Sequence, residues 1–209
     1  MTLSDDRFTI ASVLGSATIH EAAGRIGALP PAILPADPTW QIAGPAYPVR
    51  CPPGDNLWLH RALYAAEPQD VLVVETGDTE PEWGYWGEIL STAAKTRRLG
   101  GLVLQGGSRD HAHLPTVDFP VFSLGRCIRG TIKDRELDHG RLGEPIEIGG
   151  VAITAGDLVV GDVDGVVVIP EADAEAVIEG GEERELAERT AMERIRGGET
   201  TLSLFGLED

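Results

Sequence analysis

Apolar and polar positions along the chain predict a mixed α/β protein. Three short apolar runs, each bounded by glycine or polar residues, have the length of strands: Val71–Val74, Gly101–Gln105 and Phe119–Leu124. Apolar residues that recur at helical spacing predict helices over 57–66 and 83–98. We expect the glycine pair after Gln105 to end the middle strand, because glycine reaches positive φ without steric cost.

Prolines shape the expectations for the N-terminal part of the chain. The stretch Ala17–Ala22 predicts a capped helix, and the prolines that follow Leu29 predict an extended connector. Residues 42–50 have a strand pattern that contains two prolines. Because proline lacks the N–H that a central strand donates, we expect this strand at a sheet edge or at a bulge.

Closely spaced apolar runs dominate residues 145–170. The turns between them are short and rich in glycine and aspartate, which is typical of antiparallel hairpins. The predicted strands are Pro145–Ile148, Val151–Ile153, Leu158–Val160 and Gly165–Pro170.

A helical tail is predicted over Glu171–Arg196. We expect a kink near Gly180-Gly181 and an end at Gly197-Gly198. A chain of 209 residues is long enough to bury one good core. We therefore expect a single domain over 1–209, with a core at about 15–170 and C-terminal helices at about 171–197.

The chain is strongly acidic. It has 34 acidic residues against 17 lysines and arginines, and its formal net charge is −17. Such a surface repels phosphate backbones and anionic bilayers, so we expect neither a nucleic-acid partner nor a membrane partner. A small anionic substrate would need a local cluster of positive charge. Alternatively, the acidic excess serves only solubility.

The cysteines and the N-terminus indicate a compartment. Cys51 and Cys127 show no zinc-like spacing and predict reduced thiols. The first residues lack the basic and apolar segments of a secretory signal, and no apolar run approaches membrane-spanning length. We therefore expect a cytoplasmic protein.

Arg109 and Asp110, which follow the predicted strand Gly101–Gln105, are the strongest candidates for chemistry. An arginine fork grips a carboxylate through two parallel hydrogen bonds, and an aspartate oxygen suits a hard cation. Together they would suit a metal-bound oxo acid, whereas the alternative is a surface ion pair after a tight turn. Glu88 lies early in the helix predicted at 83–98, where free N–H groups could also bind an anion.

Two further clusters each allow two interpretations. His111 and His113 alternate along the chain, but no third zinc-type ligand is spaced nearby, so we expect neither to bind a metal. Four cations that lie within ten residues form either an anion-binding wall or a loop of solvated charges balanced by neighbouring acids. They are Arg126, Arg129, Lys133 and Arg135.

A set of motifs in a fixed order resembles the RraA-like family, which includes the class II 4-hydroxy-4-methyl-2-oxoglutarate/4-carboxy-4-hydroxy-2-oxoadipate aldolases. The resemblance extends from about residue 15 to about residue 200. It implies a layered, swivelling β/β/α fold that assembles as a homotrimer or homohexamer. The matching motifs are Ala43–Ala46, Pro53–Asn56, Val71–Val74, Trp86–Leu90, Gly106–Asp110, Pro120–Phe122, Arg129–Thr131, Ile148–Val151, Gly156–Asp162 and Asp164–Val168.

The resemblance assigns roles that the residues alone leave open. It implies that Asp110 is the single direct protein ligand of a Mg²⁺ or Mn²⁺ ion, and that Arg109 contacts the oxo-acid oxygens. The backbone N–H groups of Ile89 and Leu90 are implied to bind the pyruvyl carboxylate at the start of the helix. Lys133 matches a lysine on the substrate side.

Two glutamates complete the implied site. Glu185 matches a family glutamate that reaches the site of a neighbouring subunit, which implies active sites between subunits. The characterised aldolases have aspartate where this chain has Glu88, and the longer side chain would shift the water network around the metal ion. Relatives that regulate ribonucleases without catalysis also carry glutamate there, but they lack the metal-binding aspartate that this chain has as Asp110.

The implied reaction is retro-aldol cleavage of a 4-hydroxy-2-oxo di- or tricarboxylic acid to pyruvate, with oxaloacetate decarboxylation as a side activity. The substrate would chelate the metal ion, and Arg109 would stabilise the developing enolate oxygen. Glu88 and Glu185 would orient the water that removes the 4-hydroxyl proton. The alternative is a non-catalytic RraA-type protein that regulates ribonuclease activity by protein binding.

Overall fold

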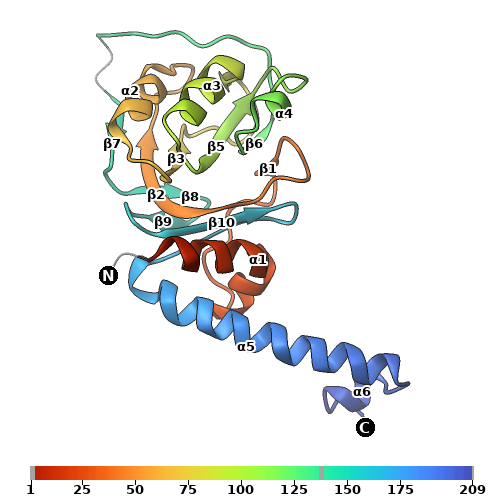
Figure 1. Cartoon of the computed structure of the whole chain (residues 1–209). Coiled ribbons are helices and arrows are strands. Elements are labelled where there is room, and N and C mark those ends of the chain that lie inside the picture. The colour runs from red at the N-terminus through yellow and green to blue at the C-terminus, as the bar shows by residue number, and fades with distance from the viewer. Residues whose placement is uncertain (1–2, 137–138, 209) are drawn as a thin grey trace.

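The computed structural model describes residues 3–136 and 139–208 and shows a layered α/β arrangement (Figure 1). The helices are α1 (Asp5–Ala22), α2 (Leu57–Ala65), α3 (Glu88–Thr96), α4 (Leu114–Val117), α5 (Glu171–Arg196) and α6 (Thr201–Leu204). The strands are β1 (Leu34–Pro35), β2 (Ile42–Arg50), β3 (Val71–Glu75), β4 (Gly84–Trp86), β5 (Gly101–Ser108), β6 (Val121–Arg126), β7 (Arg141–Leu142), β8 (Ile146–Ile148), β9 (Val151–Ile153), β10 (Leu158–Asp162) and β11 (Gly165–Ile169).

One sheet path joins two halves that are built differently. In the parallel half, β3 lies between β2 and β5, and β6 follows β5. In the antiparallel half, β2 pairs with β10, and β10 pairs with β11. The long, curved strand β2 therefore belongs to both halves and joins them (Figure 1).

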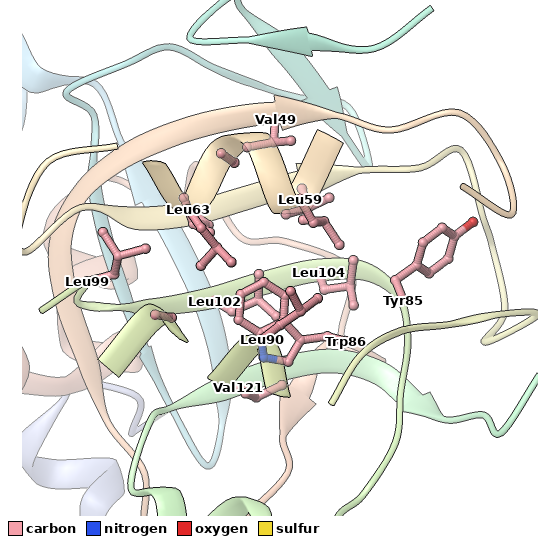
Figure 2. Close-up of a cluster of buried hydrophobic side chains, with 14 of the residues drawn as sticks. Val49, Leu59, Leu63, Tyr85, Trp86, Leu90, Leu99, Leu102, Leu104 and Val121 are labelled. Atoms are coloured by element: carbon pink, nitrogen blue, oxygen red, sulfur yellow. The ribbon is translucent and has the colours of Figure 1, made fainter. Parts of the chain in front are cut away.

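Three clusters of buried side chains separate the layers. In the first cluster, Leu59 of α2 and Leu90 of α3 pack on Leu102 of β5 (Figure 2). The second cluster lies between the parallel strands and the β8–β11 strands, and the third fixes α1 and α5 against β10 and β11. This arrangement confirms the predicted layered α/β fold, a single domain with a C-terminal helix.

The late hairpins are confirmed. β8 pairs with β9 in antiparallel register, and β10 pairs with β11 in the same way. The helix predicted over 57–66 is α2. The helix predicted over 83–98 begins only at Glu88, because Gly84–Trp86 forms β4 alongside the end of β5.

The prediction that residues 42–50 form an edge strand or a bulge is wrong. β2 pairs with β10 through Ile42–Pro45 and with β3 through Ala46–Arg50. Pro48 accepts a 2.9 Å hydrogen bond from the N–H of Gly143, so its carbonyl and its nitrogen face the side of the short strand β7. A strand that changes partners midway needs fewer N–H donors than a fully central one, and proline is tolerated.

The expectation that the glycine pair after Gln105 ends the strand predicted at Gly101–Gln105 is also wrong. β5 continues through Gly106 and Gly107 to Ser108. A Cβ on Gly106 would lie 2.8 Å from the Tyr85 ring, and one on Gly107 would lie 2.6 Å from the Trp83 carbonyl oxygen. These glycines therefore allow β4 to approach β5 closely.

The predicted kink near Gly180-Gly181 is wrong as well. α5 is one helix of 26 residues that passes through both glycines and ends at Arg196, with Gly197 as its C-cap. A Cβ on Gly181 would lie 2.9 Å from Leu14 Cδ1, so this glycine makes room for α1. Within the described residues, no helix is long and apolar enough to cross a bilayer.

α1 begins well before the predicted helix, and its buried residues Ala11 and Leu14 extend the core N-terminal to residue 15. The helix is interrupted at Gly15, whose φ of 81° lies in the left-handed region. The Asp162 carboxylate sits at this interruption. It accepts hydrogen bonds from the Ser16 N–H and Ser16 Oγ, both at 2.7 Å, and from the Asp164 N–H at 2.9 Å.

Replacing Asp162 with alanine should destabilise the protein, because Ser16 is buried and would lose both partners. Hydrogen bonds to a charged group suggest a loss of about 2–4 kcal/mol in the free energy of unfolding. Urea denaturation followed by circular dichroism measures it. The neighbouring exposed Asp164 is the control, and Asp164→Ala should change stability by less than about 0.5 kcal/mol. Equal effects of the two substitutions would contradict this account.

Candidate active site

A cavity of about 190 Å³ opens beside the carboxyl end of β5. It collects residues from the α2 start, from β4, from the α3 start and from the segment after β6. The lining residues are Asn56, His60, Tyr85, Gly87, Ile89, Leu90, Arg109, Asp110 and Lys133. Five of the residues singled out in the sequence therefore meet here: Ile89, Leu90, Arg109, Asp110 and Lys133.

Asp110 is held at the start of α3. Its φ of 60° is unusual for a residue other than glycine, and its Oδ2 accepts a 3.1 Å hydrogen bond from the Glu88 N–H. A Cβ on Gly87 would overlap the Asp110 carboxylate, so glycine at this position permits the approach. Within the described part of the chain, the other oxygen, Oδ1, accepts no hydrogen bond. It remains available to a cation.

Arg109 is anchored through its backbone and open at its side chain. Its N–H donates to the Trp86 carbonyl at 2.8 Å, which joins the end of β5 to β4. Arg109 Nε lies 4.0 Å from Asp110 Oδ2, and 42% of the Arg109 side chain is exposed. At this distance the ion pair is weak, because direct charged hydrogen bonds are about 2.7–2.9 Å long. The guanidinium can therefore bind an anion in the cavity.

The first turn of α3 faces the same cavity. The residue before it, Gly87, has no side chain to cap the helix. The first N–H groups of any α-helix lack acceptors within the helix, and they carry the positive end of its dipole. The Asp110 carboxylate accepts the hydrogen bond from the Glu88 N–H, whereas Ile89 and Leu90 line the cavity. Their N–H groups can receive a carboxylate.

Lys133 is brought to the cavity by Asp55. The Asp55 carboxylate, which is 1% exposed, accepts bonds of 2.6 Å from both the Leu57 N–H and the Asp134 N–H. The Ile132 N–H also donates to the Gly54 carbonyl at 2.9 Å. These bonds fasten the segment that carries Lys133 to the turn before α2. Asp55 therefore joins the start of α2 to the segment that carries Lys133.

Four lining residues were not predicted from the sequence as site residues: Asn56, His60, Tyr85 and Gly87. Asn56 Nδ2 donates to the Tyr85 carbonyl at 2.8 Å, and the Tyr85 hydroxyl accepts the Gly54 N–H at 2.9 Å. Burial raises the pKa of Tyr85, so its hydroxyl stays neutral. The motif Pro53–Asn56 was visible, but its turn and capping residues gave no sign that they face a cavity.

Other predicted residues lie elsewhere. Glu185, on α5, pairs with Arg189 at 2.6 Å and does not line the cavity. The basic cluster is divided, because Arg129 lies over the Trp83 ring at 3.9 Å and Arg126 lines a different cavity. Glu88 contributes its N–H, and its side chain is not among the lining groups. Within the described residues, no three His, Cys, Asp or Glu side chains form a metal-binding group.

The match to a family model decides what this fold is. Residues 2–168 match the RraA-like model, described as Aldolase/RraA. The chain belongs to the RraA-like family. Arg109 and Asp110 lie within the matched region, and both line the cavity.

The relatives include proteins with enzymatic and with regulatory names. A Halalkalibacterium halodurans protein provisionally named 4-hydroxy-4-methyl-2-oxoglutarate aldolase is 34% identical over 190 residues, covering 90% of this chain and 88% of the relative. An uncharacterized protein from Pseudomonas syringae pv. tomato is 25% identical, with a TM-score of 0.81 over 96% of each chain. RraAS2 of Streptomyces coelicolor, described as an unusual member of the RNase ES inhibitor RraA family, is 23% identical, with a TM-score of 0.76 over 92% of this chain and 98% of its own.

The His60 imidazole should report the position of Lys133. Burial lowers the His60 pKa, and the Lys133 ammonium lowers it further. Lys133→Ala should therefore raise the His60 pKa towards, but not to, its ordinary value, since burial remains. Titration of the ring proton by NMR measures the shift. The other lysine, Lys95, pairs with Asp118, and Lys95→Ala should leave the His60 pKa unchanged. If the His60 pKa were unchanged in Lys133→Ala, the position of Lys133 beside His60 would be contradicted.

Proposed function

We propose that this protein is a divalent-metal-dependent class II aldolase that cleaves a 4-hydroxy-2-oxo di- or tricarboxylic acid and releases pyruvate. One observation carries the proposal: Arg109, Asp110 and the N-terminus of α3 face one small cavity that Lys133 also lines. The aldolase-named relative supports it. Oxaloacetate decarboxylation would be a side activity, because loss of carbon dioxide leaves the same enolate.

The residues present fit a Mg²⁺ or Mn²⁺ ion. Asp110 offers a carboxylate oxygen that no described donor occupies. Magnesium keeps most of its water and is often held by one or two carboxylates, so a cluster of protein ligands is not required. When bound, the ion supplies Lewis-acid chemistry, withdrawing electrons from the 2-oxo group as the C3–C4 bond breaks.

The cavity residues bind and orient the substrate. The N–H groups of Ile89 and Leu90 would hold the 1-carboxylate in the dipole of α3. Arg109 would donate to the 2-oxo oxygen, which becomes an enolate oxygen as the bond breaks. That interaction is stronger in the transition state than in the ground state, so it accelerates the reaction. Lys133 would pair with a carboxylate of the distal half of the substrate.

The proton of the 4-hydroxyl group needs an acceptor, and two glutamates are proposed to orient a water for it. Glu88 begins α3 beside Asp110. Glu185 would come from α5 of a neighbouring subunit, because within this chain it lies away from the cavity. We accordingly propose a homotrimer or homohexamer whose active sites lie between subunits.

Two alternatives make different predictions. The likeness to RraAS2 keeps open a non-catalytic regulator of ribonuclease activity that acts by protein binding. The available Asp110 oxygen favours the enzyme. A metal-binding scaffold without turnover is the second alternative, since Glu88 stands where the aldolases have aspartate.

Asp110→Asn should abolish metal-dependent pyruvate release. The substitution keeps the size of the side chain and tolerates the positive φ, but it removes the charge that holds the cation. Pyruvate is followed with lactate dehydrogenase and NADH, from 4-hydroxy-4-methyl-2-oxoglutarate and from oxaloacetate, with Mg²⁺ and with EDTA.

In the same assay, Arg109→Ala should lower turnover by roughly 10²–10³-fold, because it removes the proposed donor to the enolate oxygen.

Asp118→Asn is the matched control for Asp110→Asn. Asp118 also has positive φ, at 55°, and is a solvent-exposed aspartate that lies outside the cavity. Its asparagine variant should retain wild-type pyruvate release. Wild-type turnover by Asp110→Asn, or release that persists in EDTA, would overturn the proposed site.

Glu88→Asp should preserve metal-dependent turnover within about tenfold, because the backbone N–H rather than the side chain of residue 88 binds Asp110. The same pyruvate assay measures it. If the wild-type protein binds Mg²⁺ without releasing pyruvate and Glu88→Asp restores release, the scaffold alternative is correct. If folded wild-type and Glu88→Asp proteins both fail to release pyruvate, the result favours the non-catalytic regulator of ribonuclease activity.

A further inference from the structure

A hydrogen-bonded chain of three side chains lies behind the Arg-Asp turn. Ser108 Oγ, at the end of β5, lies 2.9 Å from His111 Nε2 and 2.8 Å from Ser123 Oγ on β6. Ser108 is 0% exposed and Ser123 is 3% exposed. This series of hydrogen bonds therefore starts inside the sheet, at Ser123 and Ser108, and ends at His111, the residue that follows Asp110.

These contacts bracket Arg109 and Asp110 on both sides. Ser108 precedes the pair, His111 follows it, and the bond between them closes a loop around it. Backbone bonds give partial support: the Asp110 carbonyl accepts from the His113 N–H at 2.8 Å. The Arg109 N–H also donates to the Trp86 carbonyl at 2.8 Å, and the bond between Ser108 and His111 adds a side-chain contact across the pair.

The His111 imidazole would have space to move if its hydrogen bond to Ser108 were lost. A second cavity, of about 170 Å³, is lined by His111, Ser123 and Arg126. The ring contacts Ser108 Oγ through its Nε2 atom. Its other nitrogen, Nδ1, is buried without a partner among the described residues. The bond to Ser108 is thus the side-chain hydrogen bond that orients the ring at the wall of this cavity.

We propose that Ser108, Ser123 and His111 are positioning residues that hold the Asp110 carboxylate in its cation-binding direction. The inference rests on the proposed metal-dependent function. Groups that orient a metal ligand typically change metal affinity or activity by roughly 10–100-fold when they are removed. None of the three side chains needs to touch the ion or the substrate.

Mn²⁺ binding to the full-length protein, measured by electron paramagnetic resonance, tests the proposal without turnover. His111→Ala and Ser108→Ala should each raise the Mn²⁺ Kd by about tenfold. His111→Gln, whose amide can reach Ser108, should stay within about threefold of wild type. His113 is the matched control, since it is an exposed histidine two residues further along, and His113→Ala should bind Mn²⁺ as wild type does.

A Ser108→Ala/His111→Ala double variant separates positioning from general loosening of the fold. Because both substitutions remove the same bond, the double variant should be little weaker than either single variant. Additive losses, an equal loss in His113→Ala, a loss in His111→Gln as large as in His111→Ala, or wild-type Mn²⁺ affinity in the alanine variants would each overturn the proposal.

Failure of the proposed function gives a different result. If the wild-type protein binds no Mn²⁺, both the metal-dependent function and this inference are wrong. If wild type and the alanine variants bind Mn²⁺ equally and Asp110→Asn does not, the proposed metal site stands and only the positioning role of Ser108, Ser123 and His111 is wrong.

Discussion

The candidate site depends on the contact between the Asp110 carboxylate and the Glu88 N–H. It requires a residue without a side chain at position 87 and positive φ at residue 110. Through it the end of β5 is joined to the start of α3, so an anionic ligand of metals lies beside N–H groups that attract anions. A group that attracts cations therefore lies beside groups that attract anions. This suits a substrate that carries a carboxylate and also binds a cation.

Local patterns predicted most of the elements because strand length, helical spacing and turn residues are properties of neighbouring positions. The hairpins after residue 145 and helix α2 follow from such patterns. Glycine was the main source of error. Gly106, Gly107 and Gly181 were taken as breaks, whereas in the structure they admit a neighbouring strand or helix at close range. Close approach between distant segments leaves no local signal.

The candidate site was predictable in part for the same reason. Arg109 and Asp110 are adjacent in sequence, and the family resemblance pointed to Lys133, Ile89 and Leu90, which the structure places around one cavity. Asn56, His60 and Tyr85 were missed because a capping turn, a helix surface and a buried strand are their ordinary explanations. Glu185 could not be tested within one chain, since its proposed role requires a second subunit.

The cavity has two separately built parts, and the Asp55 carboxylate fastens one of them to the body of the protein. The Asp110 end belongs to the sheet and to α3, whereas Lys133 belongs to a segment held to the body by the Asp55 carboxylate and a few backbone bonds. Residues 128–135 can therefore vary in sequence while the sheet that carries Asp110 stays intact. A lineage with this architecture can change which distal group it recognises without rebuilding the end that performs the chemistry, and an engineer can do the same.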